Sequence, residues 1–196
     1  MLGARTAAWS GKALPYDAEL KYLESTGTQY ILFDESINGI DIEILPSDNN
    51  DYGAVGRWNG GSRCDTIGYT RFNGRGFYVK SARNISQVYL YDLEEKIRHI
   101  TVHGEAVTID GKSFNINGSW DSALFALFGC YNWSTKVVDA LSCKIGSCKL
   151  YFDDVLVFDF APVRVGSVGY MYDRVSGQLF GNAGTGSFII GPDKTT

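Results

Sequence analysis

Residues 98–116, RHITVHGEAVTIDGKSFNI, decide the fold class of this chain. Apolar and polar residues alternate over 98–103 and again over 106–109, as they do in a strand with one buried face. Asp110-Gly111 then reverses the chain, because a type I′ turn needs positive φ at both of its central positions and this pair accepts it. Residues 113–116 return as the next strand. The stretch therefore predicts antiparallel strands joined by a tight hairpin.

The same signals continue in both directions along the chain. Residues 40–44 alternate strictly, which puts three isoleucines on one face and the carboxylates of Asp41 and Glu43 on the other. The run 123–130 is continuously apolar and predicts one strand buried on both faces. Hairpins are expected around Asp153-Asp154, with the second strand ending at Pro162, and around Ser176-Gly177. Further strands are predicted over 30–33, 52–58, 76–80, 87–91, 148–152, 155–160, 168–172, 178–180 and 188–190.

Composition supports an all-β chain. Its 196 residues are 14% aromatic and include 23 glycines but only four prolines, which suits short strands and tight turns. So many antiparallel strands must close into a barrel or split into two packed sheets. The apolar runs and long loops favour an antiparallel two-sheet jelly-roll sandwich. We expect an extended N-terminal arm over 1–16, the sandwich domain over 17–192 and a polar tail over 193–196.

Charge and hydropathy argue against several classes of protein. The net charge is −4 and the basic residues are scattered, whereas a nucleic-acid binder usually has a basic face. No stretch is long enough for a membrane span, and the N-terminus does not resemble a signal peptide. The cysteines are expected to be thiols in reducing cytosol, because the spacing of the last two does not suit a zinc ribbon and a chain of this size needs no disulfide framework. They are Cys64, Cys130, Cys143 and Cys148.

No catalytic, metal or cofactor site is expected. Glycoside hydrolysis needs two carboxylates flanking the scissile bond. Asp41 and Glu43 share a strand face. When Asp41 is aligned with the central acid of the glucanase pattern Glu-x-Asp-x-x-Glu, the two outer glutamates are replaced by Gly39 and Ile44, so the pattern fails. His99 and His103 also share a face, yet the local sequence supplies no third metal ligand.

Two aromatic triplets are the candidate carbohydrate-binding residues. Sugars are recognised by an aromatic face and a few directed polar groups. Arg57-Trp58-Asn59 and Tyr131-Asn132-Trp133 both lie at the ends of predicted strands, where loops present side chains. Trp120 is a weaker third candidate. In the alternative interpretation these tryptophans cap the hydrophobic core.

Two long segments resemble a known family. They are 14–31, LPYDAELKYLESTGTQYI, and 149–186, with YDRVSGQLFGNAGTG at its end. Both resemble concanavalin A-like (laminin-G-like) domains found in gut bacteria and their phages. The opening GARTAAW, with Gly3, Arg5, Thr6 and Trp9, resembles the first residues of small virion structural proteins of such phages. The resemblance implies a lectin-like sandwich over about 17–192, a fold that hosts both binding and purely structural proteins.

Two functions follow as expectations. The first is a non-enzymatic bacteriophage virion protein, assembled in the host cytoplasm as a capsid decoration, head fibre or tail module. Its arm would insert into other virion subunits through Gly3, Arg5, Thr6 and Trp9. The expected assembly is a homo-oligomer, such as the trimer common in fibres. The sandwich could bind host-surface glycan. The alternative for Trp9 is that it folds back on its own domain. The second function is a bacterial carbohydrate-binding module or adhesin.

Overall fold

The computed structural model describes residues 13–46, 53–59, 63–70, 76–81, 86–90, 96–116, 118, 120 and 124–195. All regular secondary structure in these residues is β-strand, arranged in two sheets, which confirms the all-β prediction. The arrangement is compatible with a β-sandwich. The expected anchoring residues Gly3, Arg5, Thr6 and Trp9 lie outside the described residues.

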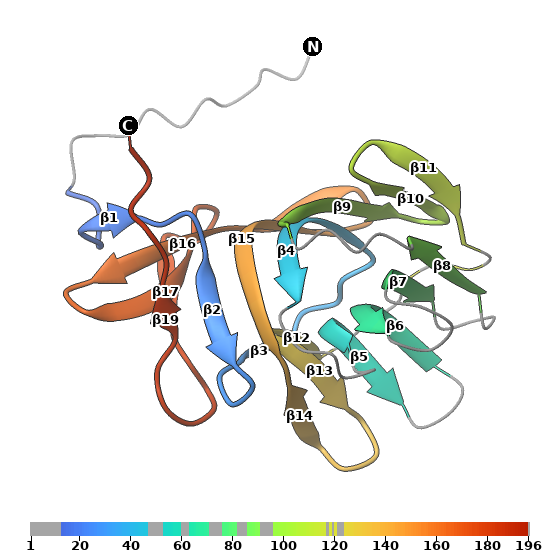
Figure 1. The fold of residues 1–196 in the computed structure, drawn as a ribbon, viewed down its shortest axis with the longest axis horizontal. Coiled ribbons are helices and arrows are strands. Elements are labelled where there is room, and N and C mark those ends of the chain that lie inside the picture. The colour runs from blue at the N-terminus through green and yellow to red at the C-terminus, as the bar shows by residue number, and fades with distance from the viewer. Residues whose placement is uncertain are drawn as a thin grey trace.

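The larger sheet has the strand order β11-β10-β9-β4-β15-β16-β17-β18, with β1, β2 and β19 paired beside this path. Figure 1 shows β1, β2, β16, β17 and β19 grouped at one end of the molecule and β5 to β8 at the other. The strands of this sheet are β1 (Ala18–Glu19), β2 (Leu23–Thr26), β4 (Gly39–Pro46), β9 (Arg98–His103), β10 (Ala106–Ile109), β11 (Lys112–Asn115), β15 (Ser142–Phe152), β16 (Val155–Val165), β17 (Val168–Asp173), β18 (Gln178–Phe180) and β19 (Ile189–Ile190).

The smaller sheet has the order β14-β13-β5-β6-β7-β8, with β12 joining β3 to β5. Its strands are β3 (Ile31–Phe33), β5 (Gly53–Asn59), β6 (Arg63–Thr70), β7 (Gly76–Ser81), β8 (Ser86–Leu90), β12 (Phe125–Leu127), β13 (Gly129–Asn132) and β14 (Val137–Ala140). Strand β13 pairs with β5 in parallel, while the other pairings in the described residues are antiparallel.

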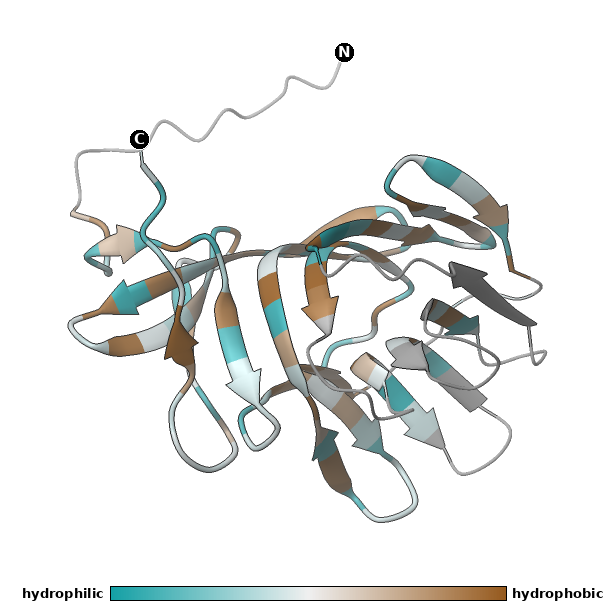
Figure 2. Ribbon diagram, viewed as in Figure 1, coloured by the Kyte–Doolittle hydropathy of each residue, from teal (hydrophilic) through white to brown (hydrophobic). Residues whose placement is uncertain are grey.

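One apolar cluster joins the two sheets. The larger sheet contributes Ile40, Ile42 and Ile44, which are fully buried as the alternation over 40–44 predicts. The smaller sheet contributes residues such as Val55 and Ile67. Figure 2 shows the corresponding alternation of hydrophobic and hydrophilic residues along β15. Burying a side chain of this size contributes about 1.5–3 kcal/mol, so the alternating strands hold the sheets together.

The predicted hairpin at Asp110-Gly111 is confirmed. Both residues have positive φ, 49° and 77°, and Ile109 pairs with Lys112 across the turn. The Asp110 carboxylate accepts hydrogen bonds from Arg98 Nη1 at 2.6 Å and from the backbone N–H of His99 at 3.0 Å. The turn residue therefore also fixes the start of β9.

The predicted single strand over 123–130 is wrong. Phe128 has φ 64° and divides the run into β12, which is antiparallel to β5, and β13, which is parallel to it. An apolar run indicates that its residues are buried but does not indicate the direction of the chain, so the reversal at Phe128 could not be predicted from it.

The predicted end of β16 at Pro162 is also wrong, because the strand continues to Val165. Pro162 lacks an N–H and usually weakens a strand. On one side β16 pairs first with β15, up to Phe160, and then with β1, from Val163. Between these two pairings the carbonyl of Pro162 accepts a hydrogen bond from the N–H of Leu20 at 2.8 Å. Leu20 continues the register of β1 opposite Pro162, so this pair keeps one hydrogen bond and lacks only the reciprocal bond that an N–H at residue 162 would donate.

Candidate functional site

The two predicted aromatic triplets lie side by side. In the parallel pairing of β5 and β13, Tyr131 is opposite Arg57 and Asn132 is opposite Trp58. The N–H of Trp133 donates to the carbonyl of Trp58 at 2.8 Å. Segments more than seventy residues apart in the sequence therefore meet at one end of the smaller sheet.

The pairing nevertheless divides the six predicted residues between two faces. Successive side chains of a strand point to opposite faces, so Arg57 shares a face with Tyr131, and Trp58 shares the other with Asn132. The Trp133 ring contacts that of Tyr131 edge to face, with centroids 6.1 Å apart, which places it with Tyr131. The side chain of Asn59 lies outside the described residues. The structure thus does not bring Trp58 and Trp133 together as one stacking platform.

Asn132 builds the turn that presents Trp133. Its side chain is buried, and its Oδ1 accepts from the N–H groups of Ser134 at 3.0 Å and Thr135 at 3.3 Å. Its Nδ2 donates to Asp139 at 3.2 Å, and its carbonyl accepts from the N–H of Lys136. Asn132 is therefore a positioning residue, since its polar groups are committed to residues 134–139.

Trp133 is the exposed aromatic residue of this turn. Its side chain is 39% exposed, whereas Tyr131 is buried. The Lys136 ammonium lies over the indole, 3.6 Å from the ring centroid, in a cation–π contact. Sequence reasoning missed Lys136 because no strand was predicted at β14 and the turn was not recognised. We name Trp133, Ser134, Thr135 and Lys136 the Trp133 turn.

Trp120 is not a surface residue. It is 1% exposed, and its Nε1 donates to the carbonyl of Lys80 at 2.9 Å. Its ring packs against Phe125. The interpretation of a tryptophan as part of the core is therefore the right one for Trp120, because the indole N–H finds a backbone acceptor inside the fold.

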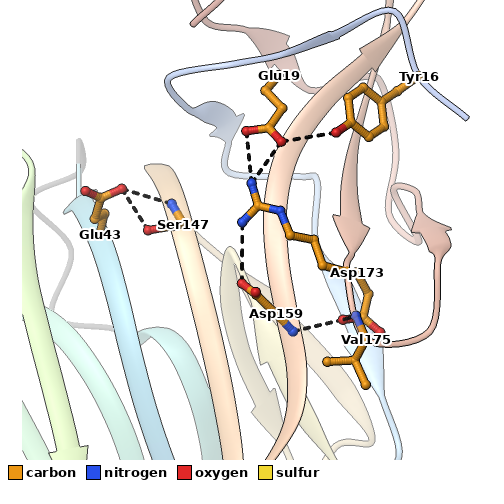
Figure 3. A network of polar contacts seen from close by, with 8 residues as sticks. Tyr16, Glu19, Glu43, Ser147, Asp159, Asp173 and Val175 are labelled. Atoms are coloured by element: carbon orange, nitrogen blue, oxygen red, sulfur yellow. Dashed lines mark hydrogen bonds and ion pairs between the residues drawn. The ribbon is translucent and has the colours of Figure 1, made fainter. Parts of the chain in front are cut away.

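Asp41 and Glu43 each bind a neighbouring side chain on the face of β4 opposite the three buried isoleucines. Asp41 Oδ1 lies 2.6 Å from His99 Nε2. Glu43 Oε2 accepts from the N–H of Ser147 at 3.1 Å and from its hydroxyl at 2.9 Å, where β15 bulges (Figure 3). The two carboxylates are thus occupied by different structural contacts.

A small hollow lies near the β15–β16 turn and is separate from the predicted sugar residues. It measures about 200 Å³ and is lined by Asn38, His103, Gly104, Asp153 and Asp154. The amide of Asn38 donates to Asp153 Oδ1 at 2.9 Å, so part of its polar lining is already paired. Within the described residues, no group of three or more His, Cys, Asp or Glu side chains is placed to hold a metal ion.

The segment that follows the predicted arm is fixed to the larger sheet. The N–H of Asp17 donates to the carbonyl of Arg164 at 2.9 Å, and its Oδ2 accepts from the N–H of Gly166 at 2.6 Å. The Tyr16 ring packs on Tyr172 with centroids 5.0 Å apart. The predicted boundary between residues 16 and 17 therefore falls inside a packed segment.

Glu19 is the centre of a polar network at this segment (Figure 3). Its two carboxylate oxygens accept from Arg174 Nη2 at 2.8 and 3.0 Å, and Oε1 also accepts from the Tyr16 hydroxyl at 3.1 Å. Burial alone would raise the pKa of Glu19, but the hydrogen bonds and charge of Arg174 lower it. Burial and the bond to Glu19 raise the pKa of Tyr16 to about 12. We name Tyr16, Asp17, Glu19, Arg164 and Arg174 the arm-root clamp.

Cys130, Cys143 and Cys148 are buried and none of the three is in a disulfide bond. Burial, with the nearby charges of Asp41 and Asp159, raises the pKa of Cys148 well above its usual value, so the thiol stays protonated and unreactive. The side chain of Cys64 lies outside the described residues. Among the described residues there is no helix with the length and apolarity to cross a membrane.

Comparisons of the chain with protein-family models, curated proteins and solved structures give no match.

Proposed function

We propose that this chain is a non-enzymatic structural protein of a bacteriophage virion, a capsid decoration, head fibre or tail module. In this proposal the part of the N-terminal arm that precedes Tyr16 anchors it to other virion subunits. A lectin-like jelly-roll domain then projects from the particle and binds host-surface glycan through the Trp133 turn. The sequence resemblance of the opening residues and of 149–186 supports the virion assignment.

The observation that carries the proposal is the arm-root clamp. A short arm can add main-chain hydrogen bonds and an aromatic anchor to a partner. Such an arm holds a domain on a particle only if its root does not peel away from that domain. Strand pairing, two carboxylates and an aromatic contact fix residues 16–19 to β16 and β17.

The paired state of Asp41 and Glu43 supports a role without catalysis. A retaining glycosidase needs a nucleophile and an acid about 5–5.5 Å apart, both facing the sugar. Here Asp41 is engaged by His99 and Glu43 by Ser147. The exposed Trp133 turn offers a surface for binding instead.

Deletion of residues 1–12 tests the anchoring role, because it removes the expected anchor and leaves the clamp intact. The truncated chain should keep the circular dichroism spectrum and melting temperature of the full chain but be missing from purified particles of the phage that encodes it. A matched control carries Trp133→Ala in the full chain and should be incorporated normally. Incorporation of the truncated chain at the normal level would refute the anchoring role.

A bacterial carbohydrate-binding module or adhesin is the second candidate, favoured by the exposed indole of Trp133. In that case the truncated chain would bind glycan as the full chain does, and no particle would contain either form.

A further inference from the structure

The Trp133 turn holds a lysine in a conformation that usually favours glycine. Lys136 has φ 60°, in the left-handed region. A glycine would adopt this conformation without strain, and asparagine would adopt it more readily than lysine. What lysine adds at this position is its ammonium group, which lies 3.6 Å from the Trp133 ring centroid.

The acids on the neighbouring strands contact residues other than Lys136. The Asp139 carboxylate accepts from Asn132, and Asp65 is buried and faces Arg57 at 3.9 Å. In the described part of the chain, Lys136 makes no ion pair, and its contact is with the indole. The turn thus combines an exposed aromatic surface with a cation available to a ligand.

The position of Lys136 also discriminates between ligands. A neutral sugar that stacks on this indole face must displace the ammonium and gains no charge partner in return. A sugar with a ring carboxylate can pair with the ammonium and keep its apolar side against the indole. The backbone N–H groups of Ser134 and Thr135 are committed to Asn132, but both residues are exposed, so their hydroxyls can contact sugar hydroxyls.

We propose that the Trp133 turn binds acidic glycans, and that the recognised group is a pyranose carrying a carboxylate, such as a uronic or sialic acid. Lys136 pairs with the carboxylate, Trp133 contacts the ring or its apolar substituents, and Ser134 and Thr135 contact hydroxyls. This inference rests on the glycan-binding part of the proposed function and adds the charge of the ligand to it.

Matched pairs of neutral and acidic sugars test the inference. The probes are lactose with 3′-sialyllactose and cellobiose with cellobiouronic acid, titrated into the full chain at low salt. Binding is measured by calorimetry and by the NMR signal of the Trp133 indole N–H, assigned with Trp133→Phe. At least one acidic member should bind about tenfold more tightly than its neutral partner. Raising the salt should reduce the difference, because an exposed ion pair is screened.

Variants separate the charge from the aromatic contact. Lys136→Met should abolish the acidic preference, and Lys136→Arg should retain it. Lys149→Met, on the larger sheet, is the matched control and should change nothing. Trp133→Ala should abolish binding of both members, with its melting temperature checked to show that it folds.

Three outcomes would overturn the inference. Equal binding of neutral and acidic sugars at Trp133, or an acidic preference that persists in Lys136→Met, would refute the role of charge while glycan binding by the turn survives. No binding of any probe would refute both the inference and glycan binding. Incorporation of the chain into particles would then decide the anchoring role separately.

Discussion

Replacing Asp110 with asparagine should destabilise the fold through the loss of one negative charge. Asparagine tolerates the positive φ of 49° at this position, so the hairpin geometry is retained. The carboxylate, however, accepts from Arg98, whose side chain is 2% exposed, and from the N–H of His99. A hydrogen bond to a charged group contributes about 1.5–3 kcal/mol, and we take about 2 kcal/mol for Asp110→Asn because Asp110 is partly exposed. This corresponds to a fall of about 4–8 °C in Tm for a chain of this size.

The pH dependence gives a second check on Asp110. Burial alone would raise its pKa, but Arg98 and the N–H of His99 lower it. A lowered pKa in the folded state stabilises the protein above the unfolded pKa of about 3.9, and this stabilisation is lost as the pH falls through the folded pKa. The difference between wild type and Asp110→Asn should therefore be full at pH 7 and shrink below about pH 4.

Urea unfolding of wild type, Asp110→Asn and Asp110→Ala measures these effects. Alanine does not tolerate positive φ as asparagine does, so Asp110→Ala should be about 1 kcal/mol less stable than Asp110→Asn. The reasoning is refuted if Asp110→Asn lies within 0.5 kcal/mol of wild type at pH 7, a change typical of surface substitutions, or if its deficit is the same at pH 3 as at pH 7.

Two further substitutions test the glycine in β5 and the clamp. Gly56→Ala should cost about 3 kcal/mol or more, because the new Cβ would lie 1.9 Å from the carbonyl oxygen of Asp65 at a φ of 124°. Gly111→Ala is its control, with positive φ but open space, and should cost about 1 kcal/mol; similar melting temperatures for the two would contradict the steric account. Glu19→Gln should cost about 1 kcal/mol at pH 7, because its pair with Arg174 is partly exposed, and urea titration should find the loss shrinking at low pH, as the pH falls below the unfolded pKa of about 4.3 and through the lowered pKa of folded Glu19. A deficit that persists there would mean that the charge of Glu19 is not what stabilises the clamp.

The sequence predicted the strands whose two faces differ in polarity. Alternation over 40–44 and the Asp110-Gly111 turn are local signals, and both elements are present in the structure. Strands without such a contrast were missed or misread. Strand β6 was missed, because glycine, threonine and cysteine separate its few strongly apolar residues. Strands β12 and β13 were misread as one strand, because they share one apolar run.

The candidate site was predictable in its residue types but not in its arrangement. Trp58 and Trp133 were selected as aromatics at strand ends, and β5 and β13 are indeed neighbours. Their separation onto two faces depends on the register of a long-range parallel pairing, which no local pattern encodes. Lys136 was missed for a similar reason, because its importance arises only when the turn folds it over Trp133.

The C-terminal segment closes against β1 and the residue that follows it. Leu20 forms a β-bridge with Asp193, and the N–H of Lys194 donates to the carbonyl of Glu19. The Asp193 carboxylate also forms a bidentate ion pair with Arg164. A fluorophore attached at Thr195 would consequently sit beside residues 19–20 on the larger sheet, whereas the Trp133 turn belongs to the smaller sheet. If the proposed arm docks on a partner, such a probe would report the docking as a change in emission and would leave the Trp133 turn unmodified.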